Sequence, residues 1–344
     1  MPLLTISTPC YNEEANVAEV HRQVKEVMAT LPGYDYDHLF IDNASTDGTV
    51  EVLRRLAAQD RHVKVIVNTR NFGTVRSPYH ALLVARGDAV ICLVADLQDP
   101  PELIPQFVRK WEEGYKIAIG VKAGSQESKC RFRVRRLYYW LIGRLSEIEL
   151  VPDFTGFGLY DREVVEQCRE TGEQAPYFRG LICDFGYARA EIEYMQPARS
   201  RGVSKHNFYS LFDAALLGIT SHSKVPLRLA ATTGFILSMF SLLIALGYLI
   251  AKLAFWNEIQ LGIAPLLIGI YFFGAVQLFF IGIIGEYIGS IHTQVHKRPF
   301  VVEKERIGFG AGSNGPSVVR ERSKALIEET KTDALPGERE QRAG

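Results

Sequence analysis

Apolar residues in the first 205 positions alternate between short continuous runs and longer amphipathic stretches. Short β-branched runs are typical of buried parallel strands, and longer runs with helical periodicity are typical of covering helices. The predicted strands are residues 3–8, 38–41, 63–67, 89–95 and 117–121. The predicted helices are residues 16–30, 49–60, 75–85 and 102–113, with Asn12 or Asn16 and Ser45 or Thr46 as N-caps. This alternation predicts an α/β domain whose mostly parallel sheet carries helices on both faces.

The pattern changes in the last third of the chain. No charged residue occurs from 229 to 251 or from 259 to 285. At 1.5 Å per residue, either run would span roughly 30 Å of hydrocarbon. Two such runs joined by a short connector predict a transmembrane hairpin over residues 225–290, in preference to two buried helices of a soluble domain. Basic residues flank both outer ends of the hairpin: Lys205, His206, Lys224 and Arg228 before it, and His292, His296, Lys297 and Arg298 after it. The positive-inside rule therefore places both termini in the cytoplasm.

The segments beside the hairpin differ in composition. Residues 206–224 carry apolar positions at helical spacing, which favours a helix in the membrane interface or one packed on the domain. Residues 291–309 form a juxtamembrane segment, and residues 310–344 have the polar composition of a disordered tail. Small residues in the uncharged runs would permit close helix packing and hence a homo-oligomer. They include Gly234, Gly247, Gly269, Gly274, Gly282 and Gly285.

Charge and cysteine content narrow the class of protein. Lys and Arg total 39 and so do Asp and Glu, so the net charge does not indicate a nucleic-acid partner. The five cysteines are scattered without metal-binding spacing, which indicates a reducing compartment and neither a disulfide framework nor a zinc site. The first residues lack the basic start of a secretory signal. We therefore expect the N-terminal domain on the cytoplasmic side of the inner membrane.

An acidic motif follows the fourth predicted strand. Residues 96–102 read Asp-Leu-Gln-Asp-Pro-Pro-Glu after the apolar run 89–95. Ligands of open α/β sheets bind beyond the carboxyl ends of the strands. The oxygens of Asp96 and Gln98 suit Mg²⁺ or Mn²⁺, and such a cation suits a diphosphate. Taken alone, the motif is equally consistent with a polar turn that ends at proline.

Polar motifs also follow the first three predicted strands. Residues 8–14 read Thr-Pro-Cys-Tyr-Asn-Glu-Glu, and residues 42–49 read Asp-Asn-Ala-Ser-Thr-Asp-Gly-Thr. Their carboxylates could accept from a ribose hydroxyl or a base N–H, or could cap helices. After the third strand, Arg70 and Asn71 suit a phosphate. The chain has no G-x-G-x-x-G after its first strand and no P-loop motif, which disfavours NAD-binding and P-loop proteins.

These four motifs and the hairpin resemble family 2 glycosyltransferases of GT-A fold, over roughly residues 3 to 305. More narrowly, they resemble the polyprenyl-phosphate glycosyltransferases, the group of dolichyl-phosphate mannose synthases and bactoprenol glucosyltransferases. The resemblance implies that Pro9, Glu13 and Asp42 line a nucleoside pocket. It also implies that Asp96 and Gln98 hold a divalent cation on the donor diphosphate.

A basic segment at the end of the α/β region extends the resemblance. Arg199 and Lys205 match a family segment, here Arg-Ser-Arg-Gly-Val-Ser-Lys, whose cationic side chains face phosphate. A basic surface loop is the alternative for this segment. Asp96, Arg199 and Lys205 are the catalytic residues that the resemblance implies.

Two segments depart from the family pattern. Val94 stands where the family commonly has the first Asp of Asp-x-Asp, so phosphate and water would have to complete the metal shell. Gly156 and Gly158 stand at the family's usual Asp and Arg. Asp153 lies three residues before Gly156 and could substitute for the missing carboxylate.

The basic residues of the chain suit an acceptor substrate that carries a phosphate. A phosphate monoester is anionic at neutral pH and can attack an anomeric carbon without a base. The stretch 129–140 interleaves Arg131, Arg135 and Arg136 with aromatic residues, and guanidinium groups suit phosphate oxygens. A lipid-headgroup patch and a solvated face are the other interpretations of this stretch.

The sequence thus predicts a catalytic domain over residues 1–205, attached to the bilayer by the hairpin. Its predicted activity is inverting transfer of a sugar from a nucleotide diphosphate sugar to polyprenyl (undecaprenyl) phosphate at the cytoplasmic face. One alternative is a family 2 enzyme with another membrane acceptor. A second is an inactive nucleotide-binding membrane scaffold, suggested by Val94 and Gly156.

Overall fold

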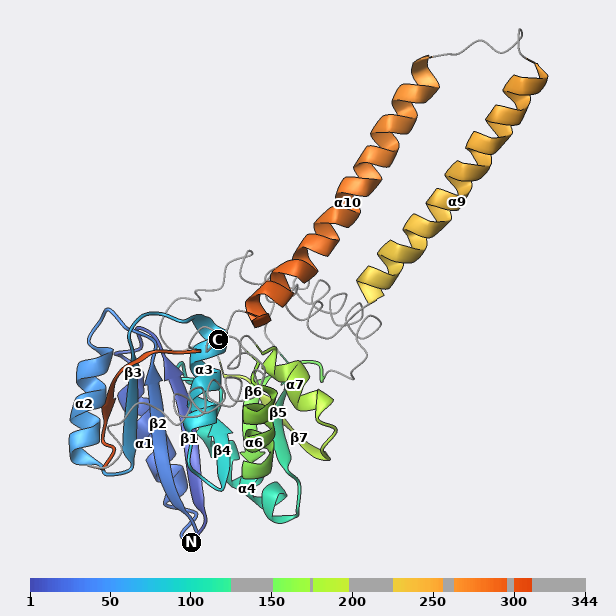
Figure 1. The fold of residues 1–344 in the computed structure, drawn as a ribbon. Helices are drawn as coiled ribbons and strands as arrows, with labels where there is room; N and C mark the ends of the chain where they lie inside the picture. The colour runs from blue at the N-terminus through green and yellow to red at the C-terminus, as the bar shows by residue number, and fades with distance from the viewer. Residues whose placement is uncertain (125–150, 174–175, 198–224, 256–262, 296–299, 311–344) are drawn as a thin grey trace, which may run out of the picture.

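The computed structural model describes residues 1–124, 151–173, 176–197, 225–255, 263–295 and 300–310 (Figure 1). The strands are β1 (Leu3–Cys10), β2 (Asp35–Asp42), β3 (Val63–Asn68), β4 (Ala89–Cys92), β5 (Ile117–Gly124), β6 (Phe154–Asp161), β7 (Arg189–Met195) and β8 (Glu303–Ile307). The helices are α1 (Val17–Met28), α2 (Thr49–Gln59), α3 (Gly73–Val84), η1 (Pro101–Leu103), α4 (Ile104–Glu112), α6 (Arg162–Thr171), α7 (Phe178–Asp184), α9 (Val225–Ala254) and α10 (Ile263–Val295).

The strands form one sheet in the order β7-β5-β6-β4-β1-β2-β3-β8. Its centre, β4-β1-β2-β3, is parallel, and β5 and β7 pair in parallel at the far edge. Among the described strands, β6 and β8 run against their neighbours. The predicted α/β fold is confirmed, and the sheet is mixed at its flanks.

Helices cover both faces of this sheet, as predicted. On one face, α1, α2 and α4 pack their apolar sides on the central strands, for example through Val24, Leu53 and Phe107, each of which is fully buried. On the other face, α3, α6 and α7 bury residues such as Leu82 and Val165. α1, α2 and α4 are amphipathic, so burial of their apolar sides fixes which face of the sheet they cover.

The predicted N-caps were partly wrong. Asn16 occupies the N-cap position of α1, but its amide donates to Glu13 Oε2 at 2.6 Å instead of capping the helix. Gly48, and not Ser45 or Thr46, precedes α2. The reason is local: the Asp47 carboxylate already accepts from the amide of Thr49 at 3.0 Å, so the N-cap of α2 lies two or three residues later than predicted.

Helices α9 and α10 lie side by side and extend away from the sheet (Figure 1). Residues 225–244 and 269–289 are long and apolar enough to cross a membrane. Large side chains on both helices, such as Phe235, Phe240 and Phe279, are more than half exposed. An exposed apolar surface of this size marks contact with lipid or with another protein.

The chain returns to the sheet after α10. Phe300 packs on Tyr79 of α3 with ring centroids 5.6 Å apart, and the carbonyl of Val302 accepts from the amide of Thr69 at 2.9 Å. β8 then pairs antiparallel with β3. The segment 291–309, expected as a juxtamembrane segment, therefore holds an edge strand, and the sheet extends beyond residues 1–205. The charged sequence Glu-Lys-Glu-Arg-Ile is typical of edge strands, which are difficult to recognise from apolar periodicity.

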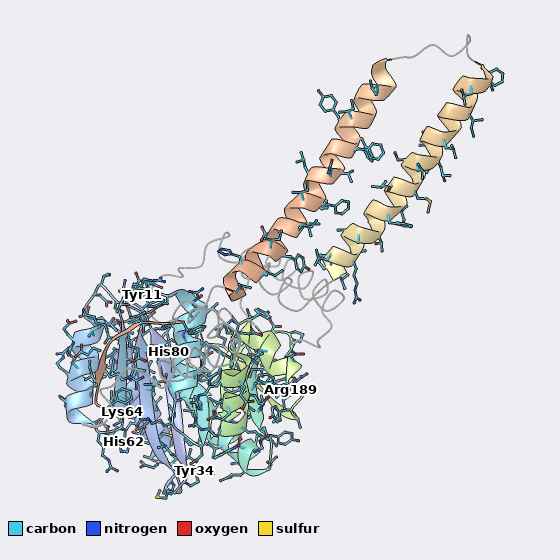
Figure 2. The ribbon with its side chains drawn as sticks, viewed as in Figure 1. Tyr11, Tyr34, His62, Lys64, His80 and Arg189 are labelled. Carbon is cyan, nitrogen blue, oxygen red and sulfur yellow. The ribbon has the colours of Figure 1, made fainter. Side chains whose placement is uncertain are left out.

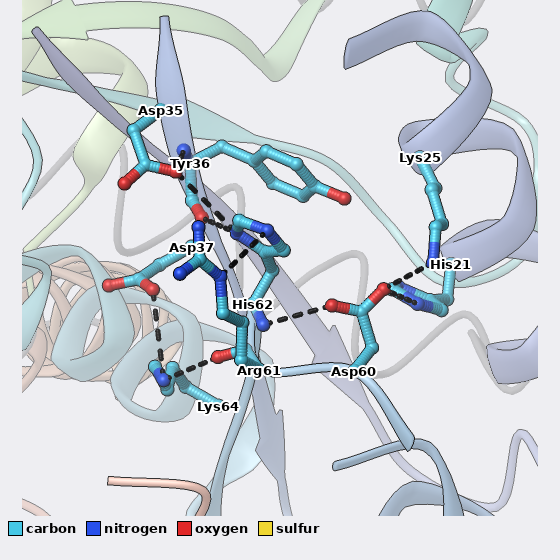
Figure 3. Close-up of polar contacts among 9 residues, drawn as sticks. All are labelled: His21, Lys25, Asp35, Tyr36, Asp37, Asp60, Arg61, His62 and Lys64. Carbon is cyan, nitrogen blue, oxygen red and sulfur yellow. Dashed lines mark hydrogen bonds and ion pairs between the residues drawn. The ribbon is translucent and has the colours of Figure 1, made fainter. Parts of the chain in front are cut away.

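A polar cluster ties α1 to the amino ends of β2 and β3 (Figure 3). Asp60 accepts from Lys25 Nζ at 2.7 Å and lies 3.5 Å from His21 Nε2. The ring of His62 stacks on Tyr36 at 4.4 Å between centroids. Although burial raises the pKa of Asp60, the bonds from Lys25 and His62 lower it to about 2, so this carboxylate is ionised at neutral pH and structural.

Glu303 fastens β8 to α3. Its carboxylate accepts from Arg306 Nε at 2.6 Å and lies 2.7 Å from Nε2 of the buried His80. Burial raises the pKa of Glu303, but the bonds from Arg306 and His80 outweigh it and lower the pKa to about 2. The stabilisation is therefore present above the ordinary glutamate pKa and is lost as the pH falls toward about 2.

We predict that Glu303→Gln lowers the free energy of unfolding by about 2 kcal/mol at neutral pH, because the ionised form carries the stabilisation. The variant should also lose part of the pH dependence of unfolding between about pH 5 and pH 2. Thermal unfolding of the detergent-solubilised protein measures both effects. Glu26→Gln, which breaks an exposed ion pair with Arg22, is the control and should change little. Parallel pH curves for Glu303→Gln and wild type would contradict the assignment.

Candidate active site

The four central strands end at one edge of the sheet, and the polar motifs follow them there. Pro9 lies beside Ile41 in the register of β1 and β2, and Cys10 lies beside Asp42. The loops after β3 and β4 carry the other predicted residues, Arg70 and Asn71 on one and Asp96 and Gln98 on the other. In Figure 2, Tyr11 marks this edge, while Tyr34 and His62 mark the opposite one. The structure thus brings the predicted donor and metal residues to a common edge.

Asp42 is fully buried and holds the turn after β2. Its Oδ2 accepts from the amide of Ser45 at 3.0 Å, and its Oδ1 accepts from the Ser45 hydroxyl. Burial raises the pKa of Asp42, although the bonds from Ser45 oppose the shift. The carboxylate therefore shapes the loop as well as standing where a nucleoside contact is predicted.

The loops after β1 and β2 are hydrogen-bonded to each other. The amide of Glu13 donates to Thr49 Oγ1 at 2.9 Å, and the amide of Asn12 donates to Ser45 Oγ at 2.8 Å. Asn12 Oδ1 in turn accepts from the amide of Thr46 at 2.8 Å. These bonds fix the position of Glu13, a predicted nucleoside contact, relative to β2.

Asn43 holds the loop after β3, a role that the sequence did not reveal. Its Nδ2 donates to Asn71 Oδ1 at 2.9 Å and to the carbonyl of Gly73 at 3.1 Å. Its Oδ1 accepts from the amide of Phe72 at 2.8 Å and from Asn68 Nδ2 at 3.2 Å. An asparagine beside an aspartate in a turn gives no sequence signal that separates this function from ordinary turn formation.

Arg70 presents a cation at the same edge. Its guanidinium carbon lies 4.0 Å from the centroid of the Phe72 ring, and one nitrogen donates to the carbonyl of Asn71 at 3.0 Å. The side chain is exposed. Stacking on an aromatic face restricts the guanidinium, which suits it to bind a phosphate.

The corner after β4 offers few metal ligands. Asp96 Oδ1 accepts from the amide of Gln98 at 3.2 Å across a turn in which Leu97 has φ +60°. Val94, at the family's usual first Asp, is 38% exposed and supplies no oxygen. Within the described residues, no group of three or more His, Cys, Asp or Glu could hold a metal ion. The donor set fits a hard cation that takes its other ligands from phosphate and water.

Asp99 lies behind this corner and is almost fully buried. It accepts from the hydroxyl of Tyr194 at 3.0 Å. Burial raises the pKa of Asp99 to about 6, although the bond from Tyr194 opposes the shift. Tyr194 belongs to β7, so this hydrogen bond joins the loop after β4 to the strand that precedes Arg199 and Lys205 in the sequence. The sequence motif contains Asp99 but does not reveal its partner 95 residues away.

Backbone strain concentrates at this edge. Four non-glycine residues of the described chain have positive φ: Asn12, Ala44, Leu97 and Asp153. The first three lie in the loops after β1, β2 and β4, and Asp153 directly precedes β6. Positive φ is unfavourable for residues with a Cβ and persists where the surroundings enforce it, often at functional sites.

Two glycines of β6, Gly156 and Gly158, stand at the family's usual Asp and Arg, and the backbone explains why. Gly156 has φ +102°, a conformation that disfavours an aspartate there. A Cβ on Gly158 would lie 2.5 Å from the carbonyl oxygen of Ala118 in β5. The family's usual Arg therefore does not fit at position 158 without displacement of β5, and its usual Asp would be strained by the positive φ at position 156.

Five predicted residues lie outside the described part of the chain: Arg131, Arg135, Arg136, Arg199 and Lys205. The strands that precede these residues in the sequence are described. β5 precedes residues 125–150 and β7 precedes residues 198–224, and both strands end at the edge that holds Asp96.

Two concave regions differ in position. A cavity of about 240 Å³ opens beside Asp42, Ser45 and Thr69 at the motif-bearing edge. A larger groove of about 660 Å³ lies at the opposite edge, against Tyr34, Tyr36 and His62. We assign the candidate active site to the edge that holds the smaller cavity, because the sequence motifs converge on this edge and Asp42 lines the cavity.

Comparison with known proteins agrees with the motifs. The profile of glycosyl transferase family 2 matches residues 5–169. A glycosyltransferase of Synechocystis, itself uncharacterised, is 34% identical over 89% of this chain and 96% of its own length. A prophage-derived bactoprenol glucosyl transferase of Shigella flexneri is 33% identical over 89% of this chain and 99% of its own length.

A solved structure is similar at greater distance. The glucosyl-3-phosphoglycerate synthase of Mycobacterium tuberculosis, in complex with Mn²⁺ and uridine diphosphate, is 18% identical, with a TM-score of 0.42 over 64% of this chain and 78% of its own.

The sheet, its polar edge and the close sequence relatives define a glycosyltransferase of GT-A fold. The chain belongs to glycosyl transferase family 2. This assignment disfavours the inactive scaffold that Val94 and Gly156 had suggested.

We predict that Asn43→Asp weakens nucleotide binding about tenfold or more, because an oxygen would replace Nδ2 opposite Asn71 Oδ1 and the carbonyl of Gly73. Isothermal titration with nucleoside diphosphates measures the effect. Gln59→Glu makes the same amide-to-acid change at an exposed position and should bind as wild type does. Unchanged binding by Asn43→Asp would show that the loop after β3 is not held in this way.

We predict that Gly158→Ala lowers the free energy of unfolding by about 1–3 kcal/mol, because its methyl group would collide with the backbone of β5. Chemical denaturation measures the change. Gly33→Ala, where a Cβ would meet no atom within 4 Å, is the control. A stable Gly158→Arg variant with raised activity would contradict the steric explanation.

Proposed function

We propose that this glycosyltransferase is anchored in the membrane and transfers a sugar, with inversion, from a nucleotide diphosphate sugar to polyprenyl phosphate. The relatives named bactoprenol glucosyl transferase, about 33% identical over nearly their whole length, support this acceptor. Two exposed apolar helices support the anchor.

One observation carries the proposal: the last described strand before the apolar hairpin ends, and the first described strand after it begins, at the edge where the motifs lie. β7 ends at that edge and precedes α9 in the sequence, and β8 begins at the same edge and follows α10. A site held at the base of a membrane hairpin can reach the phosphate of a lipid whose tail stays in the bilayer. Basic residues at both hairpin ends favour the cytoplasmic face of the inner membrane.

The residues would divide the work between the two substrates. Pro9, Glu13 and Asp42 would hold the nucleoside, and Arg70 with Asn71 would bind the diphosphate. Arg199 and Lys205 would face phosphate, and Arg131, Arg135 and Arg136 would bind the acceptor. The dianionic acceptor attacks the anomeric carbon directly, the bond to the donor diphosphate breaks, and nucleoside diphosphate leaves. Fixed cations would stabilise the charge on both phosphates, so electrostatics supplies most of the catalysis.

Asp96 and Gln98 would hold Mg²⁺ or Mn²⁺. When bound, the ion would neutralise charge on the leaving diphosphate. With a single carboxylate in the pair, we expect the ion to bind together with the donor and weakly in its absence.

We predict that the purified protein in detergent forms labelled lipid from undecaprenyl phosphate, Mg²⁺ or Mn²⁺ and at least one of a panel of labelled nucleotide sugars. Asp96→Ala should lower kcat at least about a hundredfold, because it removes the only carboxylate of the Asp96–Gln98 pair. Arg135→Ala should mainly raise the KM for the lipid. Glu102→Gln, an acid removed from the next turn, is the control.

The outcomes separate the alternatives. Labelled lipid with any donor supports polyprenyl phosphate as the acceptor. Donor hydrolysis or transfer to a different membrane lipid, with none to undecaprenyl phosphate, would favour a family 2 enzyme with another membrane acceptor. Normal turnover by Asp96→Ala would remove the metal assignment.

A further inference from the structure

The chain that follows the membrane hairpin forms a wall of the cavity beside Asp42. Lys304 and Glu305 of β8 line this cavity together with Ser45 and Thr69. The cavity therefore combines residues from the loops after β2 and β3 with residues that lie more than 230 positions later in the sequence.

A β-bulge places Lys304 at the cavity. Val67 pairs with Glu305, whereas the next residue, Asn68, pairs with Glu303, so Lys304 is the extra residue of β8. Glu305 then faces α2, where Arg54 binds it through two nitrogens at 2.7 and 2.5 Å, while Glu303 bonds to His80 of α3. Bulges redirect side chains and are frequent beside active sites.

The charges around the cavity indicate which part of a nucleotide fits. Four carboxylates line it, from Asp42, Asp47, Glu51 and Glu305, against two cations, Arg54 and Lys304. Glu305 neutralises Arg54. The Lys304 side chain is exposed at the cavity, and its charge acts on the neighbouring Glu305, whose pKa it helps Arg54 to lower. A diphosphate would be repelled by the remaining acids, whereas hydroxyl and N–H groups would find acceptors and a carbonyl oxygen would find Lys304.

We propose that Lys304 binds the nucleoside end of the donor and that β8 thereby supplies one wall of the nucleotide pocket. This inference rests on the proposed use of a nucleotide sugar. Lys304 donates to a carbonyl oxygen of the base, and the carboxylates on the opposite wall accept from base N–H or ribose hydroxyl groups. Lys304 acts on donor recognition and touches neither the lipid nor the anomeric carbon.

Titration calorimetry of the full-length protein in detergent tests the proposal, with UDP and GDP as first probes and then the monophosphate of whichever nucleotide binds. We expect Lys304→Ala to raise the Kd for the diphosphate and for the monophosphate by the same factor, about tenfold, because the contact is to the nucleoside. Lys304→Arg keeps a cationic donor and should retain most of the affinity. Lys110→Ala removes an equal charge from α4 and should bind as wild type does.

Arg70→Ala gives the contrasting pattern, because a phosphate contact should raise the Kd for the diphosphate more than that for the monophosphate. If Lys304→Ala shows that pattern, Lys304 contacts phosphate and the proposal is wrong. Unchanged affinity with an unchanged unfolding midpoint also overturns it. If wild type binds neither UDP nor GDP and transfers no sugar from any donor, the proposed function fails instead, so the two failures are distinguishable.

Discussion

Parallel pairing of β4, β1, β2 and β3 is the constraint on which the rest of the structure depends. Parallel neighbours must end at the same edge, so every loop that follows them converges there. The strands that flank this parallel centre also have an end at that edge. β5 and β7 end at that edge, and β8 begins there. One choice of strand direction therefore gathers the four donor motifs with the end of β7 and the start of β8.

Strand direction brings the four loops to one edge but does not fix their conformations. Side-chain hydrogen bonds fix them. Asn12 and Ser45 join the first two loops, Asn43 fastens the third, and Tyr194 holds Asp99 behind the fourth. Three residues in these loops, Asn12, Ala44 and Leu97, have positive φ, which shows that the loop backbones are held in conformations unfavourable for residues with a Cβ. A site whose groups are fixed before the substrate arrives loses little free energy to reorganisation.

The sequence was sufficient for whatever depends on local pattern. Apolar runs and strand-end motifs predicted the central strands, their helices and the family. It was insufficient where the deciding partner is distant. Nothing near Asp99 indicates Tyr194, nothing near Gly158 indicates the backbone of Ala118, and a strand of alternating charges such as β8 has no apolar periodicity to detect. The steric reason for the two glycines appears only when β5 and β6 are paired.

The position of β8 in the chain has a consequence for biosynthesis. Ribosomes deliver the N-terminus first, so β3 is made more than 230 residues before its partner. Until β8 has been synthesised, β3 is an edge strand with unpaired backbone groups. The amide of Thr69 then also lacks its hydrogen-bond acceptor, the carbonyl of Val302. Both apolar helices precede β8 in the sequence. They therefore leave the ribosome, and can enter a bilayer, before β8 pairs with β3. The sheet is therefore completed last, by the part of the chain that follows the two apolar helices.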